Sequence, residues 1–226
     1  MRMEAQRRTG LISKQNRSSL MRRQNNRNTN NGYLVLTLGP SYCFADPTSS
    51  EGLLGPIANQ NFFLNQEATL GFRQTLSKNL GYKASFGYNH FTGSDIKNQI
   101  RNFSFETNSY NLSIVGEYTY PLAQRFKRRV PNIVYGYLGV GVMYSDADLK
   151  PEFGGNGTYE YKDKVFSPMI PFGIGYRYEF NADFSLGAEA IFKYSFSDFL
   201  DGFKPGASKS NEVLPGIQIT LAYKLF

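Results

Sequence analysis

Residues 170–179 read Ile-Pro-Phe-Gly-Ile-Gly-Tyr-Arg-Tyr-Glu, and this stretch decides the fold. From Phe172 to Tyr178 every second side chain is aliphatic or aromatic, whereas the residues between them are glycine or charged. A repeat of two is that of a β-strand whose two faces meet different surroundings. The stretch therefore predicts a strand with one apolar face and one face of glycine and charge.

The same alternation recurs in eight blocks along the chain. We place them at about 33–44, 64–76, 80–92, 110–120, 133–145, 167–179, 183–196 and 212–226. No apolar run is long enough for a transmembrane helix, but a membrane-spanning strand needs only about 10 residues and alternates apolar and polar faces. The sequence predicts an all-β protein, an eight-stranded antiparallel transmembrane β-barrel.

Alternation alone does not tell which face is inside, because a soluble lipocalin-like barrel alternates too. The polar face mixes both signs of charge with glycine, which suits a narrow lumen where opposite charges pair. The predicted lumen charges are Glu67, Arg73, Lys83, Glu117, Arg177, Glu189 and Lys193. Tyrosines near the strand ends match the aromatic girdles of a membrane barrel; they are Tyr82, Tyr88, Tyr110, Tyr118, Tyr120, Tyr144, Tyr178 and Tyr223. Both features favour lipid outside.

The expected connections sort by length. Those after the second, fourth and sixth blocks are short and lie at 77–79, 121–132 and 180–182, whereas the others are long and lie at 45–63, 93–109, 146–166 and 197–211. Outer-membrane barrels have short periplasmic turns and long extracellular loops. We therefore expect a bacterial outer-membrane location with both termini in the periplasm.

The net charge of +7 resides in the first 31 residues, which carry eight basic side chains and one acid. Residues 1–31 lack apolar periodicity and are predicted to be a disordered periplasmic tail, with the barrel at 32–226. Arg125, Lys127, Arg128 and Arg129 form a second basic cluster, in the connection after the fourth block. Because no apolar leader of signal-peptide length is present, we expect one to have been removed.

Two basic segments on one side of a membrane are either solvated surface or a binding surface for an acidic partner or anionic lipid. The candidate partner-binding residues are Arg7, Arg8, Arg17, Arg22, Arg23, Arg27, Arg125, Lys127, Arg128 and Arg129. Nucleic acid would explain a basic tail but not the attached barrel. No nucleic-acid partner and no small-molecule substrate are expected.

Candidates for chemistry are few. His90 is the single histidine and is in phase with the apolar face, so interfacial packing is expected rather than catalysis. The acidic pairs are Asp146 with Asp148 and Asp198 with Asp201, which as loop acids would bind calcium weakly at most. Cys43, the single cysteine, leaves a small packed side chain or an intermolecular disulfide as alternatives. We predict no enzyme, no cofactor and no metal, and a salt-bridged plug rather than an ion pathway in the lumen.

The chain ends in Tyr223-Lys224-Leu225-Phe226. A terminal aromatic residue after an alternating strand resembles the assembly signal of outer-membrane barrels. Here the apolar face is in register with Leu225 rather than Phe226, one residue away from the usual pattern.

Several stretches resemble the PorG family, the outer-membrane β-barrel components of the type IX secretion system in Bacteroidetes. The stretches lie at 101–113, beginning Arg-Asn-Phe-Ser-Phe, and at 137–141, 170–176, 185–189 and 196–201, the last ending Asp-Phe-Leu-Asp. The likeness extends over most of residues 32–226, but the basic tail has no match residue by residue. It implies an accessory barrel that contacts a periplasmic ring of proteins resembling PorK and PorN, in a machine exporting proteins with a C-terminal signal.

We therefore predict a non-enzymatic barrel that docks a periplasmic ring complex to the outer membrane. One alternative is a stand-alone OmpA-like structural or adhesion barrel that acts through its extracellular loops. Another is an outer-membrane enzyme of the lipid-modifying or protease type.

Overall fold

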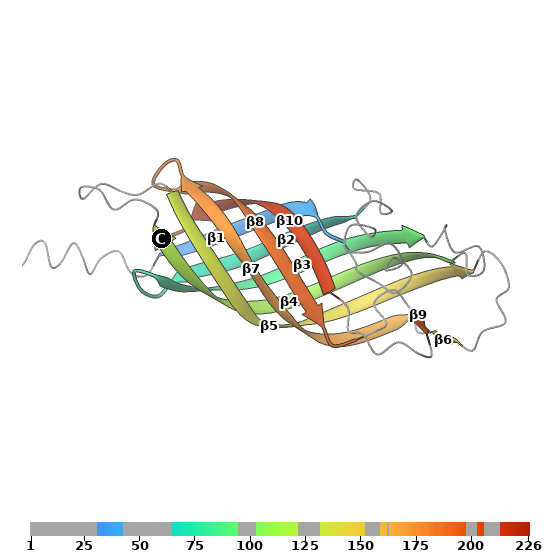
Figure 1. The fold of residues 1–226 in the computed structure, drawn as a ribbon. Coiled ribbons are helices and arrows are strands. Elements are labelled where there is room, and N and C mark those ends of the chain that lie inside the picture. Colours follow the sequence, from blue (N-terminus) through green and yellow to red (C-terminus); the bar gives the residue numbers. More distant parts are fainter. Residues whose placement is uncertain are drawn as a thin grey trace, which may run out of the picture.

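The computed structural model describes residues 31–42, 65–94, 103–121, 132–151, 159–161, 163–197, 203–205 and 213–226. These residues form one closed barrel of long, strongly tilted strands (Figure 1). The predicted tail at 1–31 falls outside the described residues except for Asn31, and so do Cys43 and the loop acids Asp198 and Asp201.

Eight strands build the barrel, and the predicted fold class is confirmed. The strands are β1 (Gly32–Pro40), β2 (Gln66–Thr75), β3 (Leu80–Ser94), β4 (Phe103–Pro121), β5 (Asn132–Pro151), β7 (Lys164–Glu179), β8 (Phe184–Ser195) and β10 (Val213–Lys224). Each pairs antiparallel with its neighbours in the order β1-β10-β8-β7-β5-β4-β3-β2. Two short strands, β6 (Tyr159–Tyr161) and β9 (Phe203–Pro205), pair with each other and were not predicted.

The barrel closes where the first strand meets the last. Leu36 of β1 lies opposite Leu221 of β10, and the ladder continues past the end of β10. The Leu225 amide donates to the Gly32 carbonyl at 2.8 Å, and the Gly32 amide donates to the Phe226 carbonyl at 3.2 Å. Leu225 continues the exposed face of β10, as expected, while the Phe226 ring packs against Gly32. Closure leaves no free edge strand in the barrel.

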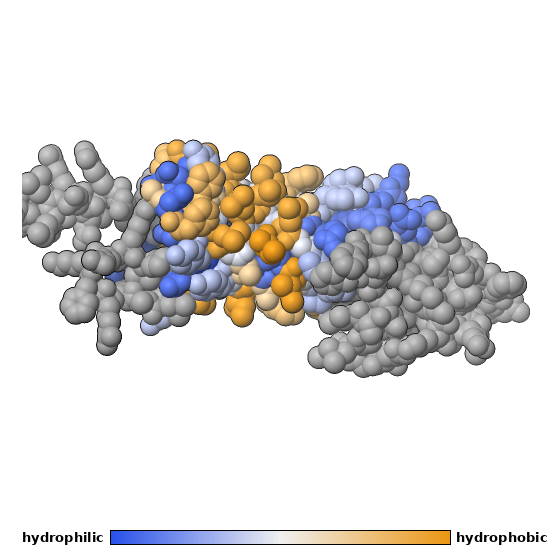
Figure 2. Space-filling model, turned by 90° about the horizontal axis from the view of Figure 1, so that it is seen from above, coloured by the Kyte–Doolittle hydropathy of each residue, from blue (hydrophilic) through white to orange (hydrophobic). Residues whose placement is uncertain are grey.

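Part of the outer wall is an apolar band. Figure 2 shows a hydrophobic band next to the end where β1 begins and β10 ends, and a hydrophilic surface beyond it toward the other end. The first of these is the end where the termini of the described barrel lie, and the other is the loop end. Aromatic side chains mark one edge of the band, where Tyr110 lies between Tyr88 and Tyr144 on neighbouring strands. Of the eight girdle tyrosines all are exposed except Tyr82, which is half-buried.

Side chains on the inner face are polar or charged at many positions, and they are buried. Val140 and Ile114, by contrast, point outward and are 69% and 59% exposed. A water-soluble domain has the opposite arrangement, with apolar residues inside. The wall is therefore built to face lipid, as expected for a transmembrane barrel. Among the described residues no helix has the length and hydropathy to cross a membrane.

Two strands are longer than predicted. β4 begins at Phe103 rather than near 110, and β5 continues to Pro151 rather than ending near 145. Thr107 and Ser109 remain buried there while Glu106 faces out, so the strand keeps its two faces after the outward face turns polar. Once the wall leaves the membrane, water is its outer surroundings, and an alternation of apolar and polar residues no longer marks the strand.

These longer strands overturn part of the predicted loop pattern. The expected long connection at 93–109 shrinks to 95–102, which is shorter than the connection at 122–131 between β4 and β5. The remaining connections at the loop end, 41–65, 152–163 and 196–212, are longer than the turns at 76–79 and 180–183. The connections at the loop end are therefore longer than those at the opposite end, except that 95–102 is shorter than 122–131.

Side chains fix the two tight turns at the end where the termini lie. The Asn79 side chain donates to the Thr119 carbonyl at 2.7 Å, which ties the β2–β3 turn to β4. In the β7–β8 turn, the Asn181 carboxamide oxygen accepts from the Asp183 and Phe184 amides at 2.8 and 2.6 Å. Such side-chain-to-backbone bonds favour asparagine in turns.

Candidate functional site in the barrel lumen

All seven predicted lumen charges lie inside the barrel and are buried. They come from five strands: Glu67 and Arg73 from β2, Lys83 from β3, Glu117 from β4, Arg177 from β7, and Glu189 and Lys193 from β8. Within a strand, side chains separated by an even number of residues share a face, so each charge lies on the same inner face as the other polar residues of its strand. The resulting network crosses the lumen rather than following one strand.

One ion pair joins β2 and β8. The Lys193 ammonium, only 2% exposed, contacts a carboxylate oxygen of Glu67 and also lies 3.3 Å from the Asn89 side-chain oxygen. The Thr69 hydroxyl donates to the same Glu67 oxygen at 3.1 Å. Further hydrogen bonds stabilise a buried ion pair, and these neighbours add them on one side only, because the other Glu67 oxygen is buried without a hydrogen-bond partner.

A second pair lies deeper toward the termini. The Lys83 ammonium is 3.1 Å from both carboxylate oxygens of Glu189, and the Tyr135 hydroxyl donates to Glu189 at 2.7 Å. The same ammonium lies 4.9 Å from the centre of the Tyr137 ring. Lys83 thus has a carboxylate and an aromatic face as partners, both of which stabilise a buried cation.

The third pair lies nearest the termini. Nη1 of Arg177 donates to Glu117 at 3.2 Å, and the guanidinium lies 5.0 Å from the centre of the Tyr135 ring. Arg73 stacks 4.3 Å from the centre of the Tyr33 ring. Among the residues that the structure describes, no carboxylate lies within 4.0 Å of Arg73.

Tyr135 and Tyr137 are the lumen residues that the sequence prediction missed. They stand on β5 directly opposite Gly175 and Gly173 of β7, and their rings occupy the space that a Cβ of either glycine would need. Aromatic rings packed over cross-strand glycines stabilise sheet pairs. The sequence could have indicated their position, because Tyr135 and Tyr137 stand four and two residues before Gly139. Residues separated by an even number of positions on one strand share a face, and the alternation assigns Gly139 to the inner face.

The rest of the lumen is filled. Serine pairs link neighbouring strands, as in Ser85 with Ser113 at 3.0 Å and Ser167 with Ser195 at 2.9 Å. Toward the loop end the buried side chains also include apolar ones, among them Met143, Met169 and Leu214. The cavity left between the ion pairs is about 20 Å³, room for about one water molecule. The described interior is therefore a packed, salt-bridged plug.

A larger cavity, about 190 Å³, opens at the end where the termini lie. Asn31, just before β1, and Lys78, in the β2–β3 turn, line its rim. Arg73, Glu117 and Arg177 line its inner part. The plug thus ends in a charged, polar mouth.

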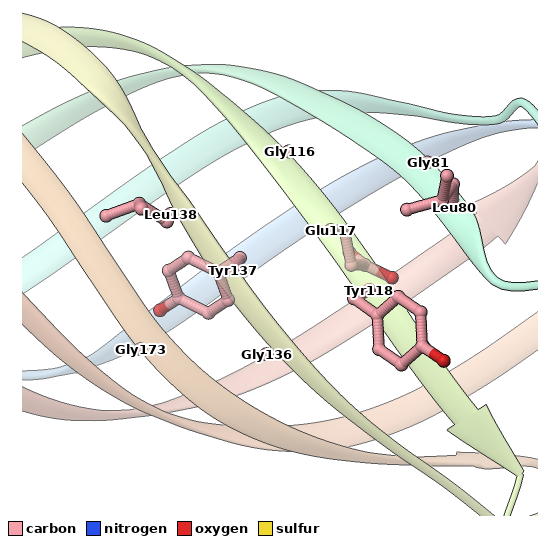
Figure 3. A pocket seen from close by; sticks show the side chains of 9 residues that line it. All are labelled: Leu80, Gly81, Gly116, Glu117, Tyr118, Gly136, Tyr137, Leu138 and Gly173. Carbon is pink, nitrogen blue, oxygen red and sulfur yellow. The ribbon is translucent and has the colours of Figure 1, made fainter.

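A hollow of about 420 Å³ lies on the outer wall, where two outward positions are glycines (Figure 3). Gly116 and Gly136 form its floor, and Leu80, Tyr118 and Leu138 surround them. A Cβ on either glycine would meet no heavy atom closer than 3.8 Å. The hollow belongs to the apolar band and therefore faces hydrocarbon, while Glu117 and Tyr137 of its lining have their side chains buried in the lumen.

The remaining predicted candidates do not converge. His90 is half-buried on the outer wall, with Nδ1 3.0 Å from the Asn108 carboxamide oxygen and Nε2 3.9 Å from Glu106. Asp146 and Asp148 face outward on β5 rather than lying in a loop, which corrects their expected position. Within the described ranges no group of three or more His, Cys, Asp or Glu side chains could hold a metal ion.

The candidate partner-binding residues lie outside the described residues. They are Arg7, Arg8, Arg17, Arg22, Arg23, Arg27, Arg125, Lys127, Arg128 and Arg129. The strands that flank 122–131 nevertheless place both ends of this segment, β4 at Pro121 and β5 at Asn132, at the same end of the barrel as Gly32 and Lys224.

Several solved structures share this fold at low sequence identity. A major outer membrane protein from Thermus thermophilus is 13% identical, with 87% of this chain and 99% of that chain covered and a TM-score of 0.51. Ail, the attachment invasion locus protein of Yersinia pestis, is 13% identical, with coverages of 87% and 99% and a TM-score of 0.47. The outer membrane protease OmpT from Escherichia coli is 10% identical, with coverages of 88% and 98% and a TM-score of 0.45.

At 13% identity the likeness to the Thermus thermophilus protein shows the fold alone, that of an outer-membrane β-barrel. No curated protein is detectably similar to the chain in sequence. A protein family does match, over residues 48–217, which is more than half of the chain. The chain belongs to the family described as "Domain of unknown function (DUF6089)".

Proposed function

We propose that this chain is a non-enzymatic outer-membrane barrel that docks a periplasmic ring complex of a type IX-like protein secretion machine. The observation that carries the proposal is the filled lumen. Three ion pairs and two tyrosine rings occupy the interior and leave about 20 Å³ between them. A barrel without a bore has its two rims and its outer wall for contacts with other molecules.

The rim at the termini favours docking of an acidic partner. The tail before Gly32 and the segment 122–131 leave the barrel at this rim, and both are rich in arginine. Opposite charge on a partner would guide its approach and orientation, and salt would weaken the contact. We place this rim in the periplasm, because two of its three turns are tight.

The resemblance to PorG supplies the partner class. In that family the barrel accompanies a periplasmic ring of proteins resembling PorK and PorN. The stretches at 137–141, 170–176 and 185–189 that carry the resemblance lie in β5, β7 and β8 of the wall. The resemblance therefore rests on the barrel, while the basic segments supply the proposed contact.

A second candidate is a stand-alone adhesion or structural barrel. The longer strands β4 and β5 favour it, since they carry a polar wall beyond the apolar band (Figure 2). Glu106 and Asp148 face each other on that wall. A strand wall in water at the loop end would present a rigid surface to the outside of the cell.

A pull-down from native outer membranes separates the two. The full chain carries an affinity tag at Gly155 in the β5–β7 connection, and bound proteins are identified by mass spectrometry. Docking predicts co-purification of PorK-like and PorN-like proteins, and their loss when the basic residues among 6–30 are all replaced by glutamine. That variant keeps the length of the tail, so it tests charge rather than reach.

The matched control replaces the asparagines at 25, 26 and 28 with serine, which leaves the tail charge unchanged. A barrel that is purified alone from mild detergent, with or without the basic tail, would refute docking. Retention of ring proteins by the uncharged tail would refute the electrostatic contact. An adhesion barrel should still reach the surface and bind after either change.

A further inference from the structure

The charges of the described residues inside the barrel do not balance. Four cations (Arg73, Lys83, Arg177 and Lys193) face three carboxylates (Glu67, Glu117 and Glu189). Each carboxylate has its own cation within salt-bridge distance. Among the described residues Arg73 is the cation with no carboxylate within 4.0 Å, although it is only 4% exposed, and the carboxylate that interacts with it at longer range is Glu117. Buried charges are normally paired, because an uncompensated charge in a low dielectric is unfavourable.

The stacking of Arg73 on Tyr33 does not neutralise its charge. A ring face attracts a cation through its quadrupole and carries no net charge. Glu117 lines the same cavity, but it already accepts from Arg177 at 3.2 Å. Two guanidinium groups and one carboxylate therefore border the inner part of the mouth cavity.

A second observation points to a missing acceptor. Nε of Arg177 is buried and has no hydrogen-bond partner, although Arg177 lines the cavity. A guanidinium offers five donors in a fixed plane, a geometry that matches the oxygens of carboxylate and phosphate groups. A buried donor without a partner is costly, and an anion in the cavity would relieve this cost.

The rim does not cancel the excess charge. Lys78 and Glu179 also line the cavity, the first exposed and the second half-buried, and their charges are opposite. The groups around the cavity therefore sum to one positive charge. The volume of about 190 Å³ accepts an oxyanion together with water, since one water needs about 10–15 Å³ by this measure.

We propose that the mouth cavity is a binding site for one small oxyanion of the phosphate or carboxylate class, with Arg73 as its principal counter-charge and Arg177 as a second donor. The inference is independent of the proposed docking function. It gives the filled barrel a ligand site at the rim where the termini lie. Free inorganic phosphate and the phosphate of a lipid headgroup are the two sources of this chemistry.

The test measures phosphate binding to the full chain in dodecyl maltoside, at constant ionic strength held with sodium chloride. Equilibrium dialysis with labelled inorganic phosphate gives stoichiometry and affinity. We expect one phosphate per chain, and binding weaker by about tenfold or more in Arg73→Gln, because a hydrogen bond between charged groups is lost. Arg73→Lys keeps the charge but not the planar donors, so it should lie between the two.

Lys164→Gln is the matched control, because it removes the same charge from an exposed position at the loop end of β7. It should bind phosphate as the unmodified chain does. Folding of each variant is checked by heat-modifiable migration in gels. If Arg73→Gln does not fold, Arg73→Lys carries the test, and wild-type affinity in that variant counts against the site.

A competition arm distinguishes the sources. Displacement of labelled phosphate by added phosphatidylglycerol, but not by a neutral glycolipid, assigns the site to lipid headgroups. Persistence of binding in excess phosphatidylglycerol assigns it to a free oxyanion. Absence of saturable binding, or equal weakening by Arg73→Gln and Lys164→Gln, would overturn the proposal.

Discussion

The ring of Tyr135 lies on Gly175, its direct cross-strand neighbour, at a distance that leaves no room for a side chain there. The glycine on β7 thus allows the β5 tyrosine to lie flat inside the barrel and reach Glu189 with its hydroxyl. One methyl group at position 175 would push the ring away from this bond. The lumen plug depends on this contact between a residue without a side chain and a large one.

We expect Gly175→Ala to destabilise the barrel by about 1–3 kcal/mol, the usual cost of overpacking a filled interior. Urea unfolding in phospholipid vesicles measures the effect. Gly116→Ala is the control, because a Cβ there points outward and meets nothing closer than 3.8 Å. Equal stability of the two variants would show that the Tyr135 ring moves aside without loss.

The Lys193–Glu67 pair gives a second prediction. Lys193→Met should destabilise the fold by about 3–5 kcal/mol, because it leaves Glu67 buried without its cation. Adding Glu67→Gln to Lys193→Met should restore much of that loss, since a neutral amide no longer needs a counter-charge. Urea midpoints of the single and double variants test this. A double variant no more stable than Lys193→Met would contradict the pairing.

The sequence predicted which residues of each strand face the lumen, but it did not predict which of these residues contact one another across the lumen. A period of two places Glu67 and Lys193 on inner faces, yet they are 126 residues apart. Their contact depends on how far neighbouring strands are staggered when the barrel closes, which alternation does not encode. The alternation along each strand determines which residues face the lumen, whereas the stagger of the strands in the closed barrel determines which of them form pairs.

Two further differences have physical causes. Tyr135 and Tyr137 are apolar enough to belong to either face, so only their phase with Gly139 and the glycines opposite them marks them as interior residues. The early part of β4 escaped prediction because Glu106 and Asn108, on its outward face, are polar, so that face lacks the apolar residues that mark it farther along the strand. A hydropathy pattern reveals a strand only where the surroundings of its two faces differ in polarity.

The outer wall gives a third prediction. Ile114→Arg should destabilise the barrel in vesicles by about 2–4 kcal/mol, because it places a charge near the middle of the apolar band. Tyr120→Arg, on the same strand at the band edge, should cost about 0–1 kcal/mol. The two residues are equally exposed, 59% and 61%, so depth rather than burial in protein is compared. Equal costs would mean that the band does not face hydrocarbon.

The filled lumen gives a fourth prediction, in planar lipid bilayers. The unmodified chain should pass no steady current, because its ion pairs and tyrosine rings leave only about 20 Å³ among them. Removing two rings with Tyr135→Ala and Tyr137→Ala together should open a path near Glu189 and produce brief cation-dependent currents. The control replaces Tyr118 and Tyr120 with alanine, two exposed rings on the outer face of β4. A steady current from the unmodified chain would refute the hypothesis of a filled lumen, and with it the inference that the barrel works through its rims. If a folded Tyr135→Ala/Tyr137→Ala variant passed no current, the residues that block the lumen would instead be those nearer the loop end, among them Met143, Met169 and Leu214.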